Sequence, residues 1–228
     1  MGGEIKSIYR LLLKEYGEQG WWPINRVYSP SFKKRKRTPE ERLEIAVGAI
    51  LTQNTSWENV EKALKNLRGA EALSREGLGK LTEKELATLV RPAGYYNMKA
   101  KKIREYLSYS GGITREGLLG VWGLGPETVD SILLYAYGQP MFVVDAYTKR
   151  ILRRMGLCGE KAAYSEIQEL FQKELKEDAA LFNEYHALLV RHAKEHCRVK
   201  PVCEGCPLWG ICRRGKGEKD KREKRGIM

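Results

Sequence analysis

Apolar residues recur every three or four positions along most of the chain, which is the spacing of one face of a helix. The clearest case is TPEERLEIAVGAILTQ, residues 38–53. Thr38 and Glu41 form a capping-box pattern, and Pro39 stands where a helix tolerates the missing N–H. We therefore expect a helix that begins at Pro39 and turns one face to the core. Its apolar positions are Leu43, Ala46, Val47, Ile50 and Leu51.

The same spacing predicts helices through most of the remaining chain. LTEKELATLV repeats the capping box with Thr82 and Glu85 and ends before Pro92, and NMKAKKIREYLSYSGG ends at Gly111 and Gly112. SEIQELFQKEL and NEYHALLVRHAKEH are two further predicted helices. No segment shows the sustained alternation of a strand, so the sequence predicts an all-α protein.

The charge balance indicates that this helical protein has a polyanionic partner. The 228 residues include 41 Lys and Arg against 29 Asp and Glu, a formal net charge of +12. Such a surplus indicates nucleic acid, although a solvated basic surface remains the alternative. SFKKRKRT at 31–38 and the charged tail 213–228 are predicted to be exposed. No apolar run of membrane length is present, and we expect a soluble, cytoplasmic chain.

A tight turn between two predicted helices is a candidate phosphate site. The sequence VWGLGPETVDSILLYAYG places Gly123 and Gly125 just before Pro126, and Gly138 ends the second helix. Both glycines permit positive φ and leave their backbone N–H groups unshielded. These groups and the helix N-terminus can hold a phosphate oxygen, as in a helix-hairpin-helix motif. By itself the pattern also fits an ordinary pair of helices.

Two further features carry candidate chemistry. Asp145 follows the apolar run FVV at the predicted start of a helix, where an aspartate commonly serves only as a cap. Four of the five cysteines fall within residues 197–212, with the spacing C-x5-C-x2-C-x5-C. In a reducing compartment such a cluster indicates a metal site more than disulfides, with zinc and iron–sulfur as the alternatives. The fifth, Cys158, is expected to be a buried filler.

Taken together, these segments resemble the helix-hairpin-helix DNA glycosylases of the endonuclease III type. The matching stretches are AILTQNTSWENV, GYYNMKAKKI, VWGLGPETVDSILLYAYGQPMFVVDAYTKRI and the cysteine loop, in the order found in the family. The resemblance implies two helical domains. A six-helix barrel at 38–147 would contain the hairpin at about 114–138. Residues 1–37 and 148–228 would form the other domain, with a [4Fe–4S] cluster loop at 197–212.

The resemblance also assigns roles to residues. Asp145 matches the catalytic aspartate, and Glu127 stands where lyase members carry the lysine that forms a Schiff base. The predicted cluster ligands are Cys197, Cys203, Cys206 and Cys212, with one residue fewer than usual between the first two. The predicted DNA contacts are Gln53, which would fill the gap left by a flipped base, Tyr95, which would wedge the opposite strand, Gly123, Gly125 and Lys149.

The tryptophan pair in GWWPINRVYSP adds a hypothesis about the base. This motif resembles the 3-methyladenine glycosylase branch, whose aromatic side chains line the base pocket, and indoles suit a cationic base. The alternative is a tryptophan pair that fills the seam between domains. By the resemblance, the base-pocket residues are Trp21, Trp22, Pro23, Leu43, Glu127 and Lys194.

The sequence thus predicts a monomeric, monofunctional glycosylase that binds duplex DNA and hydrolyses the N-glycosidic bond of an alkylated purine such as 3-methyladenine. Three alternatives remain. The first is a monofunctional enzyme for mismatched thymine, uracil or adenine. The second is a bifunctional glycosylase/lyase, which Glu127 disfavours. The third is a DNA-binding protein without catalysis, which the retention of Asp145 disfavours.

Overall fold

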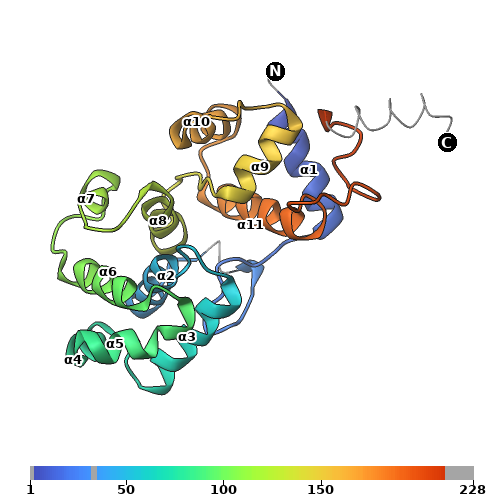
Figure 1. The fold of residues 1–228 in the computed structure, drawn as a ribbon. Helices are drawn as coiled ribbons and strands as arrows, with labels where there is room; N and C mark the ends of the chain where they lie inside the picture. Colours follow the sequence, from blue (N-terminus) through green and yellow to red (C-terminus); the bar gives the residue numbers. More distant parts are fainter. Residues whose placement is uncertain (1–2, 32–34, 214–228) are drawn as a thin grey trace. The chain divides into compact units, whose positions relative to one another are not determined.

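The computed structural model describes residues 3–31 and 35–213, shown as a ribbon in Figure 1. Contacts divide this part of the chain into two compact units. The hairpin unit comprises residues 22–141, and the terminal unit combines residues 3–21 with 142–213. The predicted barrel domain, 38–147, shares most of its residues with the hairpin unit but begins later and ends later. Most of the predicted tail, 214–228, lies outside the described residues, as do residues 32–34 of the basic loop.

Regular structure in the described ranges is helical, as predicted, and the only pairing of the strand type there is an isolated bridge between Ile24 and Val27. None of the helices described is both long enough and apolar enough to cross a membrane. The hairpin unit contains α2 (Pro39–Leu51), α3 (Trp57–Gly69), α4 (Arg75–Lys80), α5 (Glu83–Leu89), η2 (Arg91–Ala93), α6 (Tyr96–Ser108), α7 (Arg115–Leu119), α8 (Pro126–Ser131) and η3 (Ile132–Ala136).

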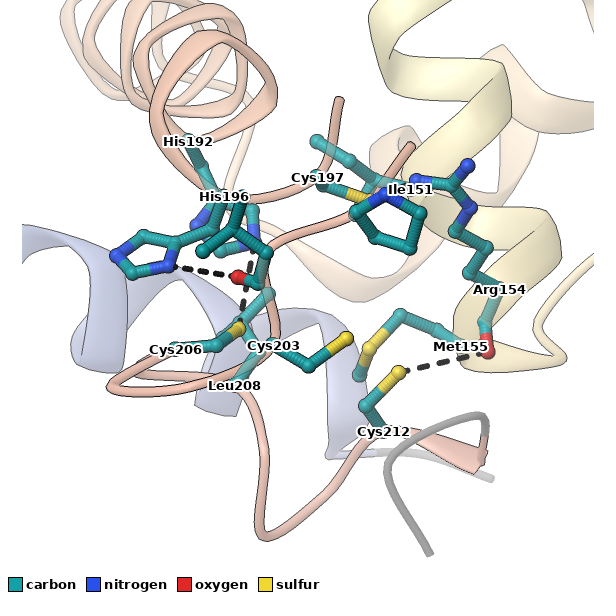
Figure 2. Close-up of a pocket in the computed structure, with 12 residues that line it drawn as sticks. Ile151, Arg154, Met155, His192, His196, Cys197, Cys203, Cys206, Leu208 and Cys212 are labelled. Atoms are coloured by element: carbon teal, nitrogen blue, oxygen red, sulfur yellow. Dashed lines mark hydrogen bonds between the residues drawn. The ribbon is translucent and has the colours of Figure 1, made fainter. Parts of the chain in front are cut away.

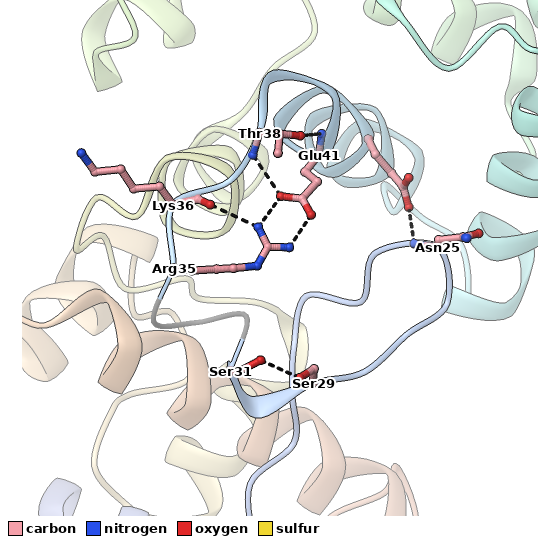
Figure 3. A network of polar contacts seen from close by, with 8 residues as sticks. Asn25, Ser29, Ser31, Arg35, Lys36, Thr38 and Glu41 are labelled. Atoms are coloured by element: carbon pink, nitrogen blue, oxygen red, sulfur yellow. Dashed lines mark hydrogen bonds and ion pairs between the residues drawn. The ribbon is translucent and has the colours of Figure 1, made fainter.

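The predicted capping box at the start of α2 is confirmed (Figure 3). The Thr38 hydroxyl accepts from the Glu41 amide at 3.3 Å, and the Glu41 carboxylate accepts from the Thr38 amide at 3.0 Å. Arg35 donates from Nη1 to the same carboxylate at 2.8 Å. These contacts hold the pKa of Glu41 below its usual range, and the hydrogen bond from Arg35 has the largest effect. The box predicted from Thr82 and Glu85 is also present, at the start of α5.

Helix α2 is more deeply buried than its pattern predicts. Every residue from Leu43 to Leu51 is buried, whereas the sequence indicates a single core face. The helix packs against α3, α6, α8 and η3, so neighbours surround it. Glu44 is tolerated among them because its carboxylate accepts from Arg68 at 2.8 Å and from the Asn25 amide at 3.0 Å. A helix that is apolar on all sides is typical of such a central position.

The hairpin differs in detail from its prediction. Gly123 adopts φ +83°, as a tight turn requires, but Gly125 has φ −91° and is the N-cap of α8. The sequence predicts an unbroken helix from Pro126 to Gly138. Instead α8 gives way at Ile132 to the π-helical segment η3. Helix α6 also ends earlier than predicted, at Ser108 rather than at the two glycines.

The terminal unit is built from both ends of the chain. Its helices are α1 (Glu4–Tyr16), α9 (Ala146–Met155), α10 (Tyr164–Glu174) and α11 (Ala179–Glu195). Tyr185 of α11 donates its hydroxyl to the Ile5 carbonyl of α1 at 2.8 Å, which joins the two ends. Phe142 and Phe171 stack at 3.7 Å between ring centroids, and Tyr185 meets both rings edge-on. This aromatic core fixes the segment that leads directly into Asp145.

Candidate functional site

Asp145 lies at the N-terminus of α9, with its carboxylate largely enclosed. One oxygen, Oδ1, accepts from the Thr148 amide at 2.7 Å, so the side chain caps the helix as predicted. The other, Oδ2, lies 3.7 Å from Nε2 of His186. Burial by itself raises the pKa of Asp145, but the nearby imidazole of His186 and the hydrogen bond from the Thr148 amide outweigh it, and the net pKa is lowered. The carboxylate is therefore ionised at neutral pH.

His186 is a site residue that the sequence reasoning missed. It belongs to α11, is 8% exposed, and reaches Asp145 from across the terminal unit. The only sequence signal was a histidine on the apolar face of the predicted helix 183–196, which is common in ordinary cores. Folding therefore supplies an imidazole beside the candidate catalytic carboxylate.

The two lysines of the terminal unit that the sequence predicts as site residues have different environments. Lys149, one turn after Asp145, is half-buried with its ammonium 6.0 Å from the centre of the Tyr164 ring. Lys194 is exposed near the end of α11, where its carbonyl accepts from Arg198 Nε at 2.7 Å. The DNA role of Lys149 and the base-pocket role of Lys194 stay predictions.

The tryptophan pair is divided between the units. Trp21 falls in the terminal unit and is partly exposed, whereas Trp22 belongs to the hairpin unit and is only 2% exposed. The Trp22 ring packs edge-on against Trp57 at 5.0 Å and lies 5.3 Å from Tyr135. It also covers the bare backbone of Gly48 on α2, where a Cβ would lie 2.7 Å from the indole. In this arrangement Trp22 fills the core of its own unit.

The other predicted residues of the hairpin unit have varied exposure. Pro23 and Leu43 are buried, and Glu127 is exposed in the first turn of α8. Tyr95 is 72% exposed and holds a left-handed conformation with φ +45°, just before α6. Gln53 is partly buried, with its amide against the hairpin. A protruding tyrosine held in a rare backbone conformation is typical of a functional loop.

All four clustered cysteines line one largely apolar cavity in the terminal unit (Figure 2). No three His, Cys, Asp or Glu side chains in the described part of the chain are grouped as ligands for one metal ion. Burial, with the neighbouring thiols, raises the pKa of Cys206 to about 11. Metal binding would therefore have to release a proton from this thiol. Cys158, expected to be buried, is half-buried instead, and burial raises its pKa.

Helix α9 holds the start of the cysteine loop through two arginines one turn apart. Arg150 donates from Nε to the Cys197 carbonyl at 2.8 Å. Arg154 donates to the Cys197 sulfur at 3.2 Å and to the carbonyls of Arg198 and Val199 at 2.6 and 2.9 Å. The helix that begins at Asp145 thus also fixes the first residues of the loop.

A buried histidine supports the other side of the same loop. His192 of α11 is 1% exposed, and its Nδ1 lies 3.0 Å from the Tyr16 hydroxyl. Its Nε2 lies 3.9 Å from the Cys206 sulfur. Burial and the nearby His196 lower the pKa of His192 to about 4, so the imidazole is neutral at physiological pH. The loop therefore contacts α9 at its start and α11 near its middle.

Comparisons with known proteins agree with this arrangement. Residues 47–177 match the family model of the HhH-GPD superfamily of base excision DNA repair proteins. The "Putative DNA repair glycosylase" of Methanocaldococcus jannaschii is 43% identical over 91% of this chain and 95% of its own. Endonuclease III of Thermotoga maritima is 31% identical over 83% of this chain and 95% of its own.

Two solved structures show similar folds. An endonuclease III in a non-covalent DNA complex superposes with a TM-score of 0.78 at 21% identity, covering 96% of this chain and 99% of that one. The 3-methyladenine DNA glycosylase of H. pylori, bound to 1,N6-ethenoadenine, has a TM-score of 0.65 and 28% identity. It covers 84% of this chain and 96% of its own. This chain belongs to the HhH-GPD superfamily and is an endonuclease III-like base excision DNA glycosylase.

Proposed function

We propose that this DNA glycosylase is monofunctional and hydrolyses the glycosidic bond of alkylated purines, 3-methyladenine above all. The observation that carries the monofunctional part is Glu127, in the first turn of α8 directly after the hairpin. A Schiff base requires an amine, and a carboxylate cannot form one. The lysine used by bifunctional relatives therefore has no counterpart at this position.

Asp145 would act on the sugar. Its ionised carboxylate would stabilise the positive charge that develops on the deoxyribose as the bond to the base breaks, and would orient the attacking water. The lowered pKa keeps the carboxylate charged throughout the neutral range. Capping by the Thr148 amide fixes its orientation before DNA binds, so little reorganisation is needed during the reaction.

Two observations support an alkylated purine as the substrate. The H. pylori 3-methyladenine glycosylase is similar over most of this chain. The pair Trp21 and Trp22 offers indoles of the kind that attract a cationic base, although Trp22 would have to expose a ring that now packs against Trp57. A base that is already cationic leaves readily, so a strong general acid is not required.

We also propose that the four cysteines of the loop hold a [4Fe–4S] cluster. Four thiolates are the donor set that such a cluster requires, and all four side chains line the same cavity. Bound there, the cluster would fold the loop. Arg150, Arg154 and His192 would then support it from the neighbouring helices.

The test is a panel of duplexes that each carry one lesion, incubated with the protein and scored for strand breaks with and without alkali. We expect breaks only after alkali, because a monofunctional enzyme leaves an intact abasic strand, and we expect them with 3-methyladenine. Borohydride should trap no adduct. A strong adduct would refute the monofunctional proposal. Release of thymine from a G·T mispair, with no release of methylated adenine, would refute the proposal that alkylated purines are the substrate.

A further inference from the structure

The segment that follows α2 is fixed by two lysines of α6. Lys99 is only 2% exposed and donates to the Leu51 carbonyl at 2.9 Å and to the Ala93 carbonyl at 2.7 Å. Lys102, one turn further along α6, donates to Oε1 of Gln53. One ammonium thus holds the end of α2, and the other holds the side chain two residues beyond it.

The amide of Gln53 is also bound at its other end. Its Nε2 donates to the Thr128 hydroxyl at 2.9 Å and to the Gly123 carbonyl at 3.2 Å. The amide orientation follows from these partners, because its oxygen faces a pure donor and its nitrogen faces two acceptors. The side chain is therefore held in one conformation between α6 and the hairpin.

The hairpin itself is shaped to receive Lys102. The aliphatic stem of Lys102 lies so close to Gly123 that a Cβ on the glycine would come within 2.6 Å of the lysine Cγ. Gly123 also has φ +83°, a conformation that favours glycine. Lys102, Gln53 and the hairpin turn consequently form one packed group in which each member limits the others.

We propose that Lys102 is a positioning residue that sets the side chain of Gln53 for entry into the duplex gap left by a flipped base. The inference rests on the proposed function and on the role that the family resemblance predicts for Gln53, which is to fill that gap. Because Lys102 and the hairpin restrict the glutamine before DNA arrives, less rotamer freedom is lost on binding. Lys102 thus acts through Gln53 and the hairpin rather than on the base.

The competing role for Lys102 is a simple phosphate contact, and its neighbour provides the control. Lys101 carries the same charge on the same helix, but its ammonium lies 4.4 Å from the centre of the Trp122 ring. Lys101→Met and Lys102→Met each remove one positive charge and keep an aliphatic stem. Only the second removes a partner of Gln53.

The experiment measures affinity for a duplex with a tetrahydrofuran abasic-site analogue, divided by affinity for the same undamaged duplex. Lys102→Met should lower this ratio about tenfold, within the usual range for coupled neighbours. Gln53→Ala should lower it at least as far, and the double variant no further than Gln53→Ala. Lys101→Met should weaken both affinities equally and leave the ratio unchanged. Thermal melting checks that each variant is folded.

The proposal would be overturned if the double variant lowered the affinity ratio by the product of the two single effects, because Lys102 would then act independently of Gln53. A ratio that Lys102→Met does not change would also overturn it, as would a ratio that Gln53→Ala does not change. The analogue contains no base to excise. Failure of the lesion panel would therefore count against the proposed substrate, and failure of this cycle against the role of Lys102.

Discussion

Asp145 combines two tasks in one side chain, because one carboxylate oxygen caps α9 and the other faces His186. Asparagine caps a helix about as well as aspartate. Asp145→Asn should therefore leave thermal stability nearly unchanged and lower single-turnover excision by about a hundredfold or more, since it removes charge needed in the transition state. DNA affinity should change little. Excision equal to that of the wild type would show that the Asp145 carboxylate is not catalytic.

Lys99 makes stability depend on pH in the alkaline range. Burial, aided by the charge of Lys102, lowers its pKa from 10.5 to about 8 in the folded protein. Between these two values the unfolded chain binds the proton more tightly, so protonation disfavours folding. The contribution of Lys99 to the free energy of unfolding is thus most favourable above pH 10.5, falls as pH drops from 10.5 to about 8, and levels off below that.

The measurement compares wild type with Lys99→Met by denaturant unfolding at several pH values. Relative to the variant, the wild type should gain free energy of unfolding as pH rises from about 8 to 10.5. The other titrating groups are shared and cancel in the difference. A difference that stays constant over this range would contradict the depressed pKa.

At the scale of the elements, the two glycines of the hairpin turn differ in backbone conformation and in the space around them. Gly123 has φ +83° and lies against Lys102, whereas Gly125 has φ −91° and open space, with no neighbouring atom within 4 Å of where a Cβ would lie. Gly123→Ala should destabilise the protein by about 1–3 kcal/mol, because it adds backbone strain and displaces the lysine stem. Gly125→Ala should change the free energy of unfolding by less than about 1 kcal/mol, because the reduced entropy of the unfolded chain is opposed by the poorer fit of alanine to the N-cap.

Denaturant unfolding of both variants tests this contrast, and DNA binding across a salt series tests its consequence. Because Gly123 is part of the proposed phosphate site, its substitution should also weaken binding and flatten the dependence of log K on log salt. Equal stability of the two variants would show that the turn does not depend on the left-handed conformation of Gly123.

At the scale of the whole molecule, the cysteine loop should contribute to the stability of the terminal unit. If it holds a [4Fe–4S] cluster, the protein will be brown and contain about four irons per chain. Cys203→Ser should lose the iron, the visible absorbance and much of the DNA affinity. Cys158→Ser, at a half-buried cysteine outside the loop, should keep all three.

Iron and zinc analysis of protein purified without oxygen checks this prediction, together with visible absorbance spectra. A colourless protein with one zinc per chain would refute the cluster. Loss of iron in Cys158→Ser would place this thiol among the ligands instead of one of the four in the loop.

Much of the architecture could be predicted because its determinants are local. The capping boxes at Thr38 and Thr82, the left-handed Gly123 and the cap formed by Asp145 each depend on residues within four positions. Helical spacing of apolar residues likewise needs only a short window, so the all-α class followed from it. The roles assigned to Asp145, Glu127 and the cysteines followed from resemblance.

The tertiary structure decided the contacts between residues far apart in the chain. His186 meets Asp145 from another helix, Lys102 holds Gln53, and Trp22 is buried in the core of its own unit. A sequence pattern shows which face of a helix is apolar, but not which neighbour covers it. These three arrangements depend on how the helices pack, and packing is set by the whole unit rather than by any segment of it.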